Sequence, residues 1–338
     1  MRQPVERHLN VAARAWLIMI VSLSLPTPAT LARETGQHRG AHYGATTAAE
    51  RQACEKAYEA LPATVTQSVL HSGNPNDFLP YKTRLLAYDR ACYKPWDTLR
   101  PQTRAAVGNM VGFFFLKEDG AWNPVCAGFR ISTALVVTAR HCLYAAERMG
   151  AILIDPTQYE FRLLAAPARA FHSTGSQSPH TSQDPLTDSS DYLVLKVDTT
   201  TVPFNSRQVV LRSDVPYREI LLIPGISVYS YWFRQKMRIE SWPAAVRIDK
   251  SPSCTRFPFP MTEGTPAERR RCILTQCQTL QAMSGAPIVG YDPATQQLLV
   301  GGIHLRSGPE PRPECGNQQG FNVGVTLPAE ILQLAGGG

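Results

Sequence analysis

The pattern of apolar and polar positions changes near Arg104. From there to the end of the chain, short apolar runs recur with Gly, Pro, Asp and Ser between them. This pattern predicts many antiparallel strands, in a sandwich or a barrel. The region over residues 104–338 has 235 residues, a length that suits two small barrels packed together. The runs are VGNMVGFFFLK, ALVVTA, GAILI, YLVLKV, QVVL, EILLI, APIVG and QLLVGGIHL.

Upstream of this region the pattern is helical. Residues 46–61 can form a helix that Thr46 or Thr47 caps at its N-terminus and that a proline ends. A second helix is predicted over residues 81–93 (YKTRLLAYDRACY). Together with a polar, Gly-rich linker, these helices make up an extension over residues 33–103.

Residues 1–32 have the features of an export signal. Three arginines flank or precede an apolar run over Ala15–Leu25, and small residues follow at Ala29 and Ala32. This run of eleven residues is too short for a membrane span, which needs about 20 residues. We therefore expect a secreted or periplasmic protein with no stable membrane insertion after signal removal; the alternative is a retained membrane anchor.

Export changes what the eight cysteines predict. An even number of cysteines in an exported chain favours disulfides over free thiols or metal ligands. None of them forms a Cys-x-x-Cys pair, so we expect no metal site. Cys54 and Cys92 would join the two predicted helices into a small clip. The cysteines occupy positions 54, 92, 126, 142, 254, 272, 277 and 315.

Composition and charge narrow the picture only slightly. The chain is 43% hydrophobic and 18% charged, as globular proteins are. Its formal net charge is +7 and is spread along the sequence, with no basic stripe interleaved with aromatic residues. We therefore expect no nucleic-acid partner, and no motif implies a metal or organic cofactor.

The first segment with candidate chemistry is TARHC, which places His141 directly after an apolar strand and beside Cys142. Cys126 lies sixteen residues before Cys142, and a disulfide between them would staple the loop that carries the histidine. A general base must lie within about 3 Å of the proton it removes, so a fixed loop suits that role. Taken alone, a His-Cys pair is usually structural.

Two later segments supply a carboxylate and a hydroxyl. In SSDYLVLKV, Asp191 precedes an apolar strand, where a buried carboxylate can orient a histidine. In QAMSGAPI, Ser284 lies in a turn of small residues, and the backbone N–H groups of Ala282 and Ser284 could face a developing oxyanion. Taken singly, such an aspartate is usually a cap and such a serine part of an ordinary turn.

Together, the three segments resemble the chymotrypsin-like (trypsin-like) serine protease family, in its bacterial branch, where the catalytic residues follow the order His, Asp, Ser. Intervals of 50 and 93 residues separate His141 from Asp191 and Asp191 from Ser284, and the resemblance covers about residues 104–335. It implies a mainly β fold: two packed six-stranded antiparallel β-barrels with a C-terminal helix, preceded by the helical extension. It also implies a catalytic triad that hydrolyses peptide bonds through an acyl-enzyme.

The same resemblance extends to the cysteines. The family carries the Cys126–Cys142 pair, and it implies a Cys277–Cys315 bridge between two walls of the specificity pocket. Cys254 is then left to pair with Cys272.

Two positions depart from the family. Met283 stands where animal digestive members have an aspartate that pairs with a newly cleaved N-terminus, so that activation switch is absent. Ala282 stands where the family has glycine, which adopts the required backbone more easily than alanine. Loss of one oxyanion donor costs about 10²–10³ in rate. The alternative to an active protease is therefore a catalytically impaired homologue that binds a partner protein.

The resemblance also places the specificity pocket. Gln278, six residues before Ser284, lines its floor, so cleavage after basic residues is disfavoured. His304 matches a pocket histidine of the glutamyl endopeptidases, and Thr279 and Ser307 could add hydroxyl groups that bind a carboxylate. We therefore expect protein or peptide substrates with an acidic residue before the cut, and a monomeric protein; alternatively, His304 simply packs within its strand.

Overall fold

A computed structural model gives the arrangement of the chain, and Gly40–Gly338 form one compact unit within it. The structure describes residues 47–61, 79–118, 120–147, 150–153, 155–180, 184, 186–213, 215, 221–227, 239–249, 254–257, 271–277, 280, 282–292, 294–307, 315 and 321–336. The predicted signal peptide and the linker that follows it lie outside these residues. Across the described residues, no helix is both long and apolar enough to cross a membrane.

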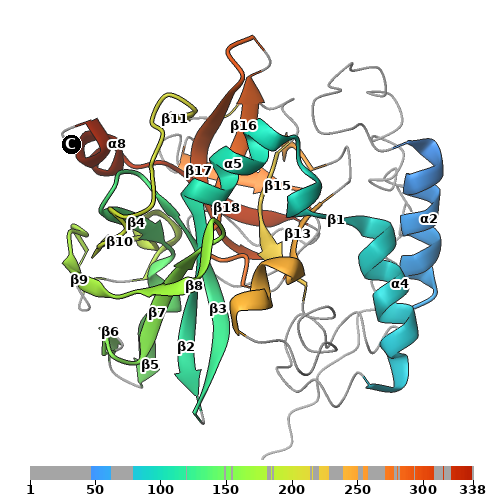
Figure 1. Ribbon diagram of the computed structural model, residues 1–338, viewed down its shortest axis with the longest axis horizontal. Helices are drawn as coiled ribbons and strands as arrows, with labels where there is room; N and C mark the ends of the chain where they lie inside the picture. Colours follow the sequence, from blue (N-terminus) through green and yellow to red (C-terminus); the bar gives the residue numbers. More distant parts are fainter. Residues whose placement is uncertain are drawn as a thin grey trace, which may run out of the picture. The chain divides into compact units, whose positions relative to one another are not determined.

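Two helices of the N-terminal extension lie side by side (Figure 1): α2 (Ala48–Glu59) and α4 (Lys82–Cys92). Thr47 caps α2, because its hydroxyl accepts the Glu50 N–H while the Glu50 carboxylate accepts the Thr47 N–H. The Cys54–Cys92 disulfide joins the two helices, as the sequence predicted.

The extension is built into the rest of the fold. Directly after α4, strand β1 (Tyr93–Pro95) pairs with β13 (Val246–Asp249), which also pairs with β12 (Gly225–Ile226). The buried guanidinium of Arg247 on β13 lies 3.2 Å from the buried carboxylate of Asp89 on α4. Residues far apart in the sequence are thus tied together by backbone pairing and by a desolvated ion pair.

Helix α5 (Pro101–Met110) leads from the extension into the first large sheet, so the first four residues of the run VGNMVGFFFLK are helical rather than extended. Within the described residues, seven strands form this sheet in the order β8-β7-β2-β3-β4-β10-β9, with every pairing antiparallel. Their bounds are Val111–Glu118 (β2), Ala121–Arg130 (β3), Leu135–Thr138 (β4), Tyr159–Leu163 (β7), Ala166–Phe171 (β8), Ser173–Ser176 (β9) and Leu193–Val197 (β10).

A second sheet follows in the C-terminal half. Among the described strands its order is β11-β17-β18-β15-β14, with β16 also paired to β17; β11 runs parallel to β17 and the other pairings are antiparallel. The bounds are Val209–Leu211 (β11), Arg256–Phe257 (β14), Cys272–Thr275 (β15), Pro287–Asp292 (β16), Gln297–Ser307 (β17) and Asn322–Thr326 (β18).

Smaller elements complete the described fold. They are the hairpin β5 (Tyr144–Glu147) and β6 (Gly150–Leu153), the 3-10 helices η2 (Trp96–Thr98), η3 (Arg140–Cys142), η4 (Asp188–Ser190) and η5 (Ile239–Ala245), and the C-terminal helix α8 (Ala329–Gly336). The fold is therefore mainly β with antiparallel sheets and a C-terminal helix. This confirms the predicted class and is consistent with two packed chymotrypsin-like barrels.

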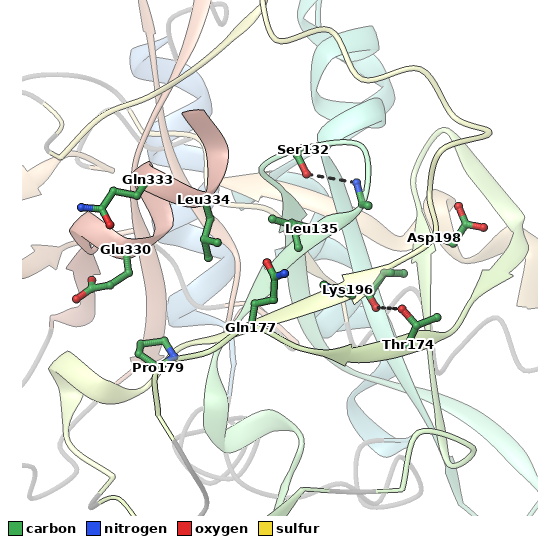
Figure 2. Close-up of a pocket in the computed structure, with 12 residues that line it drawn as sticks. Ser132, Leu135, Thr174, Gln177, Pro179, Lys196, Asp198, Glu330, Gln333 and Leu334 are labelled. Atoms are coloured by element: carbon green, nitrogen blue, oxygen red, sulfur yellow. Dashed lines mark hydrogen bonds between the residues drawn. The ribbon is translucent and has the colours of Figure 1, made fainter. Parts of the chain in front are cut away.

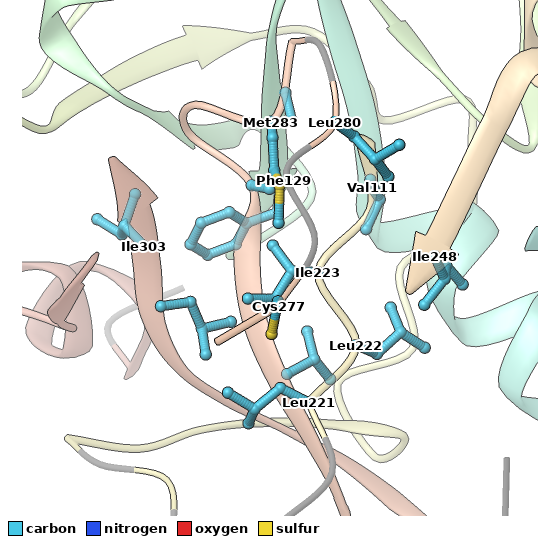
Figure 3. Close-up of a cluster of buried hydrophobic side chains, with 14 of the residues drawn as sticks. Val111, Phe129, Leu221, Leu222, Ile223, Ile248, Cys277, Leu280, Met283 and Ile303 are labelled. Atoms are coloured by element: carbon cyan, nitrogen blue, oxygen red, sulfur yellow. The ribbon is translucent and has the colours of Figure 1, made fainter. Parts of the chain in front are cut away.

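Apolar side chains of both sheets share a buried core. Figure 3 shows Phe129 of β3 and Ile303 of β17 in one cluster with Met283, Cys277 and Ile223. Because this cluster contains residues from both sheets, burial of apolar surface packs the two sheets against each other. The contact surface between them is where the candidate chemistry lies.

All eight cysteines lie in the described part of the chain and form disulfides. The Cys126–Cys142 bridge is present as predicted, but two predicted pairs are wrong. Cys254 pairs with Cys277, and Cys272 pairs with Cys315, in place of Cys254–Cys272 and Cys277–Cys315.

The strand register explains the correction. β14 and β15 are antiparallel with Arg256 opposite Thr275, so two residues further out Cys254 lies opposite Cys277, with the Cα atoms 4.1 Å apart. Cys272 lies at the other end of β15, five residues from Cys277. A strand rises about 3.3 Å per residue, which places Cys272 far beyond bonding distance of Cys254.

Candidate active site

His141 and Asp191 meet at the ends of two neighbouring strands. β4 ends at Thr138, and β10 begins with the residue opposite Thr138 in the antiparallel register. Residues that follow β4 therefore lie beside residues that precede β10. η3 carries His141 on one side, and Asp191 follows η4 on the other.

The Asp191 carboxylate holds His141 through two hydrogen bonds. Nδ1 of the ring lies 2.7 Å from Oδ2, and the His141 backbone N–H donates to Oδ1 over 2.9 Å. Asp191 is fully buried, whereas 27% of the His141 side chain is exposed. With its proton on Nδ1, the imidazole has Nε2 as its remaining basic nitrogen, which is the arrangement a general base requires.

The loop that carries His141 is fixed on both sides of the histidine. Cys142 is bonded to Cys126 on β3, with the Cα atoms 6.0 Å apart. The buried Arg140 donates from Nη2 to the Asp184 carbonyl over 3.0 Å, and its guanidinium lies 5.7 Å from the centre of the Tyr144 ring. The position of the imidazole therefore does not depend on Asp191 alone.

The half-buried Ser284 lies in a turn whose backbone is bonded to both sheets. Its carbonyl accepts the Ala127 N–H of β3 over 2.9 Å. The next N–H, of Gly285, donates to the His304 carbonyl of β17 over 2.7 Å, and the His304 N–H donates to the Ala286 carbonyl over 2.8 Å. The serine thus lies where the first sheet meets the second.

Close packing at Gly285 brings this turn to the segment that carries His141. Gly285 has φ +80°, and a Cβ there would lie 2.7 Å from the Ala139 backbone nitrogen and collide with the Thr138 hydroxyl. Only glycine fits such a position. Ala139 precedes His141 by two residues, so the turn packs against the loop that carries His141. Among the described residues, no hydrogen bond joins the Ser284 hydroxyl to the imidazole; catalytic hydrogen bonds are often long in proteins without substrate.

The two residues before Ser284 differ in what they do. Met283 is 3% exposed and, in Figure 3, its side chain lies in the apolar cluster near Phe129. It therefore offers no charge for a newly cleaved N-terminus. Ala282 has φ +53°, in the left-handed region that favours glycine. The turn therefore keeps a left-handed backbone conformation at position 282, although the residue there is alanine and not glycine.

Of the predicted pocket residues, His304 is the one whose side chain the structure describes. It is 1% exposed, and its Nδ1 has no hydrogen-bond partner among the described residues. Burial, with a smaller effect of the nearby His141, lowers the pKa of His304 from 6.5 to about 3. Gln278 and Thr279 lie outside the described residues, and Ser307 ends β17 with its side chain outside them.

A buried ion pair next to the site did not stand out in the sequence. Arg306 of β17 binds the carboxylate of Asp188, the first residue of η4, with both groups buried. Asp188 precedes Asp191 by three residues, and Arg306 follows His304 by two. The sequence offers only a weak signal, a charged residue beside an apolar strand.

A groove of about 820 Å³ lies elsewhere, between the first sheet and α8. Figure 2 shows Leu135 of β4 and Leu334 of α8 on opposite sides of it, with Gln177 between them. Leu135 begins β4, whereas His141 follows the end of that strand, and His141, Asp191 and Ser284 do not line the groove. The groove is therefore separate from the candidate site.

Comparisons with known proteins give similarities in structure only. No protein-family profile matches the chain, and no curated protein does. A crystal structure of the protease Anisep from Arthrobacter nicotinovorans has 12% identity and a TM-score of 0.42, and the match covers 68% of this chain and 94% of that one.

Two further solved structures are similar to the same extent. A Glu endopeptidase in complex with MPD has 16% identity and a TM-score of 0.43, covering 70% of this chain and 93% of that one. A thermostable serine protease, AL20, from an extremophilic microorganism has 14% identity and a TM-score of 0.43, covering 68% and 96%.

Proposed function

We propose that this chain is a serine endopeptidase that hydrolyses peptide bonds through an acyl-enzyme, with His141, Asp191 and Ser284 as its catalytic triad. The observation that carries the proposal is the buried Asp191 carboxylate bonded to a partly exposed His141. Packing of the Ser284 turn against the loop of that histidine supports it further.

Each residue has a distinct part in the proposed reaction. The Ser284 hydroxyl attacks the substrate carbonyl while Nε2 of His141 removes its proton. The same nitrogen then protonates the leaving amine, and a water molecule repeats the sequence on the acyl-enzyme. Asp191 keeps the imidazole oriented and stabilises its protonated form. The backbone N–H groups of Ala282 and Ser284 would stabilise the oxyanion.

The proposal includes export to the periplasm or the outside of the cell. The predicted signal over residues 1–32 supports it, as do the four disulfides, because such bonds persist in oxidising compartments.

We further propose a preference for an acidic residue before the cut. His304 supports it: a buried imidazole whose Nδ1 has no partner in the described part of the chain can bind a carboxylate. Because burial lowers its pKa to about 3, His304 is neutral at pH 7 in the free protein. A bound carboxylate would favour the protonated ring, so acidic substrates should bind with uptake of a proton and more tightly at lower pH.

One observation favours a second candidate, an impaired homologue that binds a partner protein. Ala282, whose N–H is the proposed oxyanion donor, has a left-handed φ of +53°. An L-residue other than glycine is strained there by about 1–2 kcal/mol, so the turn could leave that backbone when nothing binds to it.

Cleavage of a peptide library by the purified protein tests both candidates. The proposed protease cuts after Glu or Asp, Ser284→Ala abolishes the cutting, and Ser206→Ala, at an exposed turn, leaves it unchanged. Cutting after Lys, Arg or large apolar residues would refute the acidic preference alone. A folded protein that cuts nothing, but is retained by a partner protein, would favour the second candidate.

A further inference from the structure

The ion pair between Asp188 and Arg306 joins the segment before Asp191 to the strand that holds the Ser284 turn. Nε of Arg306 lies 3.2 Å from Oδ1 of Asp188, and Nη2 lies 3.3 Å from Oδ2, so the guanidinium binds the carboxylate through two hydrogen bonds. The Asp188 side chain is fully buried and the Arg306 side chain is 5% exposed. A two-bond contact of this kind fixes the orientation as well as the distance of its partners.

A third contact ties the same carboxylate to a segment that is bonded to β15 of the second sheet. The Cys315 N–H donates to Oδ2 of Asp188 over 3.2 Å, and Cys315 is bonded to Cys272 at the start of β15. Asp188, at the start of η4, is therefore held by two separate segments that belong with the second sheet. Rotation of η4 would break both contacts.

Asp188 of the pair is connected directly to Asp191 through the backbone of η4. The Asp191 N–H donates to the Asp188 carbonyl over 3.4 Å, which closes the short turn of η4. Because only two residues lie between the two aspartates, the position of Asp188 sets the point from which the Asp191 side chain reaches His141.

Arg306 of the pair is connected to the Ser284 turn through strand β17. Arg306 lies two residues from His304 on β17, and the His304 backbone is bonded to Gly285 and Ala286. The strand that holds Arg306 is thus the strand that holds the turn of the nucleophile. A displacement of β17 relative to η4 would change the separation between the Asp191–His141 pair and Ser284.

Charge gives the pair a second effect on the site. Asp188 and Asp191 are both buried and lie three residues apart, and like charges in a region of low dielectric repel each other. The Arg306 guanidinium compensates the charge of Asp188. Without it, the buried Asp188 carboxylate would lose the guanidinium that balances its charge, and removing one partner of a buried ion pair is strongly unfavourable.

We infer that Asp188 and Arg306 are positioning residues, which hold the His141–Asp191 pair in register with the Ser284 turn across the junction of the two sheets. The inference rests on the proposed function, because it concerns the same triad. Neither side chain is required to touch the substrate.

Steady-state kinetics of Asp188→Asn, Arg306→Met and Arg306→Lys test this role. We expect Asp188→Asn and Arg306→Met to lower kcat about tenfold or more, with KM changed less than about threefold, because small misplacements of reacting groups lower rates steeply. Arg306→Lys keeps the charge and loses the two-bond geometry, so it should recover part of kcat.

Another buried Asp–Arg pair among the described residues provides a matched control. Asp89 and Arg247 are also buried and 3.2 Å apart, but they join the extension to β13. Asp89→Asn should lower the melting temperature about as much as Asp188→Asn while leaving kcat within about twofold, since it leaves the triad in place. Equal losses of kcat in the two variants, or wild-type kcat in folded Asp188→Asn, would overturn the inference.

Proton NMR separates this inference from the proposed function. The proton between His141 and Asp191 should give a far-downfield resonance, which we expect to shift or exchange faster in Asp188→Asn and to stay unchanged in Asp89→Asn. This readout needs no activity. Wild-type protein that neither cuts peptides nor reacts with a fluorophosphonate would refute the proposed function, whereas an unchanged resonance in Asp188→Asn would refute the positioning role.

Discussion

The two halves of the candidate site differ in how firmly their groups are held. On the first sheet, His141 is bonded to a buried carboxylate through its ring and its backbone, and a disulfide begins at the next residue. On the second sheet, the Ser284 turn is fixed by backbone hydrogen bonds at Ser284 and Gly285, but it also contains Ala282 at a φ of +53°.

This difference shows where the chain departs from the site geometry that the proposed function calls for. The part of the site on the first sheet, with His141 and Asp191, is held by burial, by a paired carboxylate and by a disulfide. The part with the Ser284 turn has an alanine in a backbone conformation that favours glycine. We therefore expect substitutions around His141 and Asp191 to lower activity strongly, and a substitution of Ala282 by glycine to raise it.

Asp191→Asn should have the largest effect. The amide keeps the shape of the side chain but cannot stabilise the imidazolium, and it allows the wrong tautomer, so kcat should fall about 10⁴-fold. Peptide hydrolysis measures this, with the exposed Asp198→Asn as the control. A loss of less than about tenfold would show that His141 works without the carboxylate.

Removal of the Cys126–Cys142 disulfide should have the next largest effect. The bond closes a loop of sixteen residues, and a loop of this length contributes about 3 kcal/mol to the free energy of unfolding. We expect Cys126→Ser with Cys142→Ser to lose about that much in urea unfolding, and also to lose activity per folded molecule.

The Cys54–Cys92 disulfide provides the control for that double variant. Its loop is longer, with a separation of 38 residues, but it joins the two helices of the extension. Cys54→Ser with Cys92→Ser should therefore lower stability while activity per folded molecule stays near wild type. If both double variants lost activity equally, the staple would have no special relation to His141.

The buried His304 predicts a pH dependence of stability. Its pKa falls from 6.5 to about 3 because burial penalises the charged ring. Below pH 6.5 the unfolded chain binds a proton that the folded protein does not, so this contribution is complete above pH 6.5 and is lost as the pH falls toward 3. The loss should reach about 1.4 kcal/mol per pH unit within that window.

His304→Asn should flatten this dependence. Urea unfolding at pH 7 and pH 5 measures it, and wild type should lose up to about 2 kcal/mol more than the variant between these values. The exposed His172→Asn serves as the control and should leave the slope as in wild type. Equal losses in wild type and His304→Asn would mean that the imidazole already titrates normally in the folded protein.

Ala282→Gly should have the smallest effect and the opposite sign. Glycine removes a strain of about 1 kcal/mol at positive φ, so the rate of acylation should rise about two- to fivefold. Gln296→Gly is the matched control, because Gln296 also has a positive φ, of 57°, in a turn away from the site. A lower rate in Ala282→Gly would show that the alanine side chain stabilises the active turn.

Much of the fold followed from local patterns. The N-terminal helices and the apolar runs depend on residues close in sequence, and α2, α4 and most of the described strands lie near their predicted positions. The described residues of the run EILLI form only an isolated bridge, at Leu222. The C-terminal helix α8, which the family resemblance implied, is present. The prediction of a strand from Val107 was wrong for the first four residues of that run, because helix α5 extends to Met110 before the strand begins. A proline at the first position of that helix favours it.

The contacts that could not be predicted are those set by three-dimensional register. Cys254 pairs with Cys277 because β14 lies opposite β15, and a list of cysteine positions does not contain that pairing. Asp188 and Arg306 are 118 residues apart and meet only after both sheets pack. The candidate triad, by contrast, lies in three short segments, and their joint resemblance to a serine protease family could be seen in the sequence.

The most direct test of the central claim is the site of labelling by a fluorophosphonate, which reacts with a serine only when a general base activates it. Intact protein is labelled and the modified residue is identified by tandem mass spectrometry. We predict a single adduct on Ser284 that disappears in Ser284→Ala and His141→Ala. No adduct on folded protein, or an adduct on another residue, would contradict the claim that His141, Asp191 and Ser284 act together.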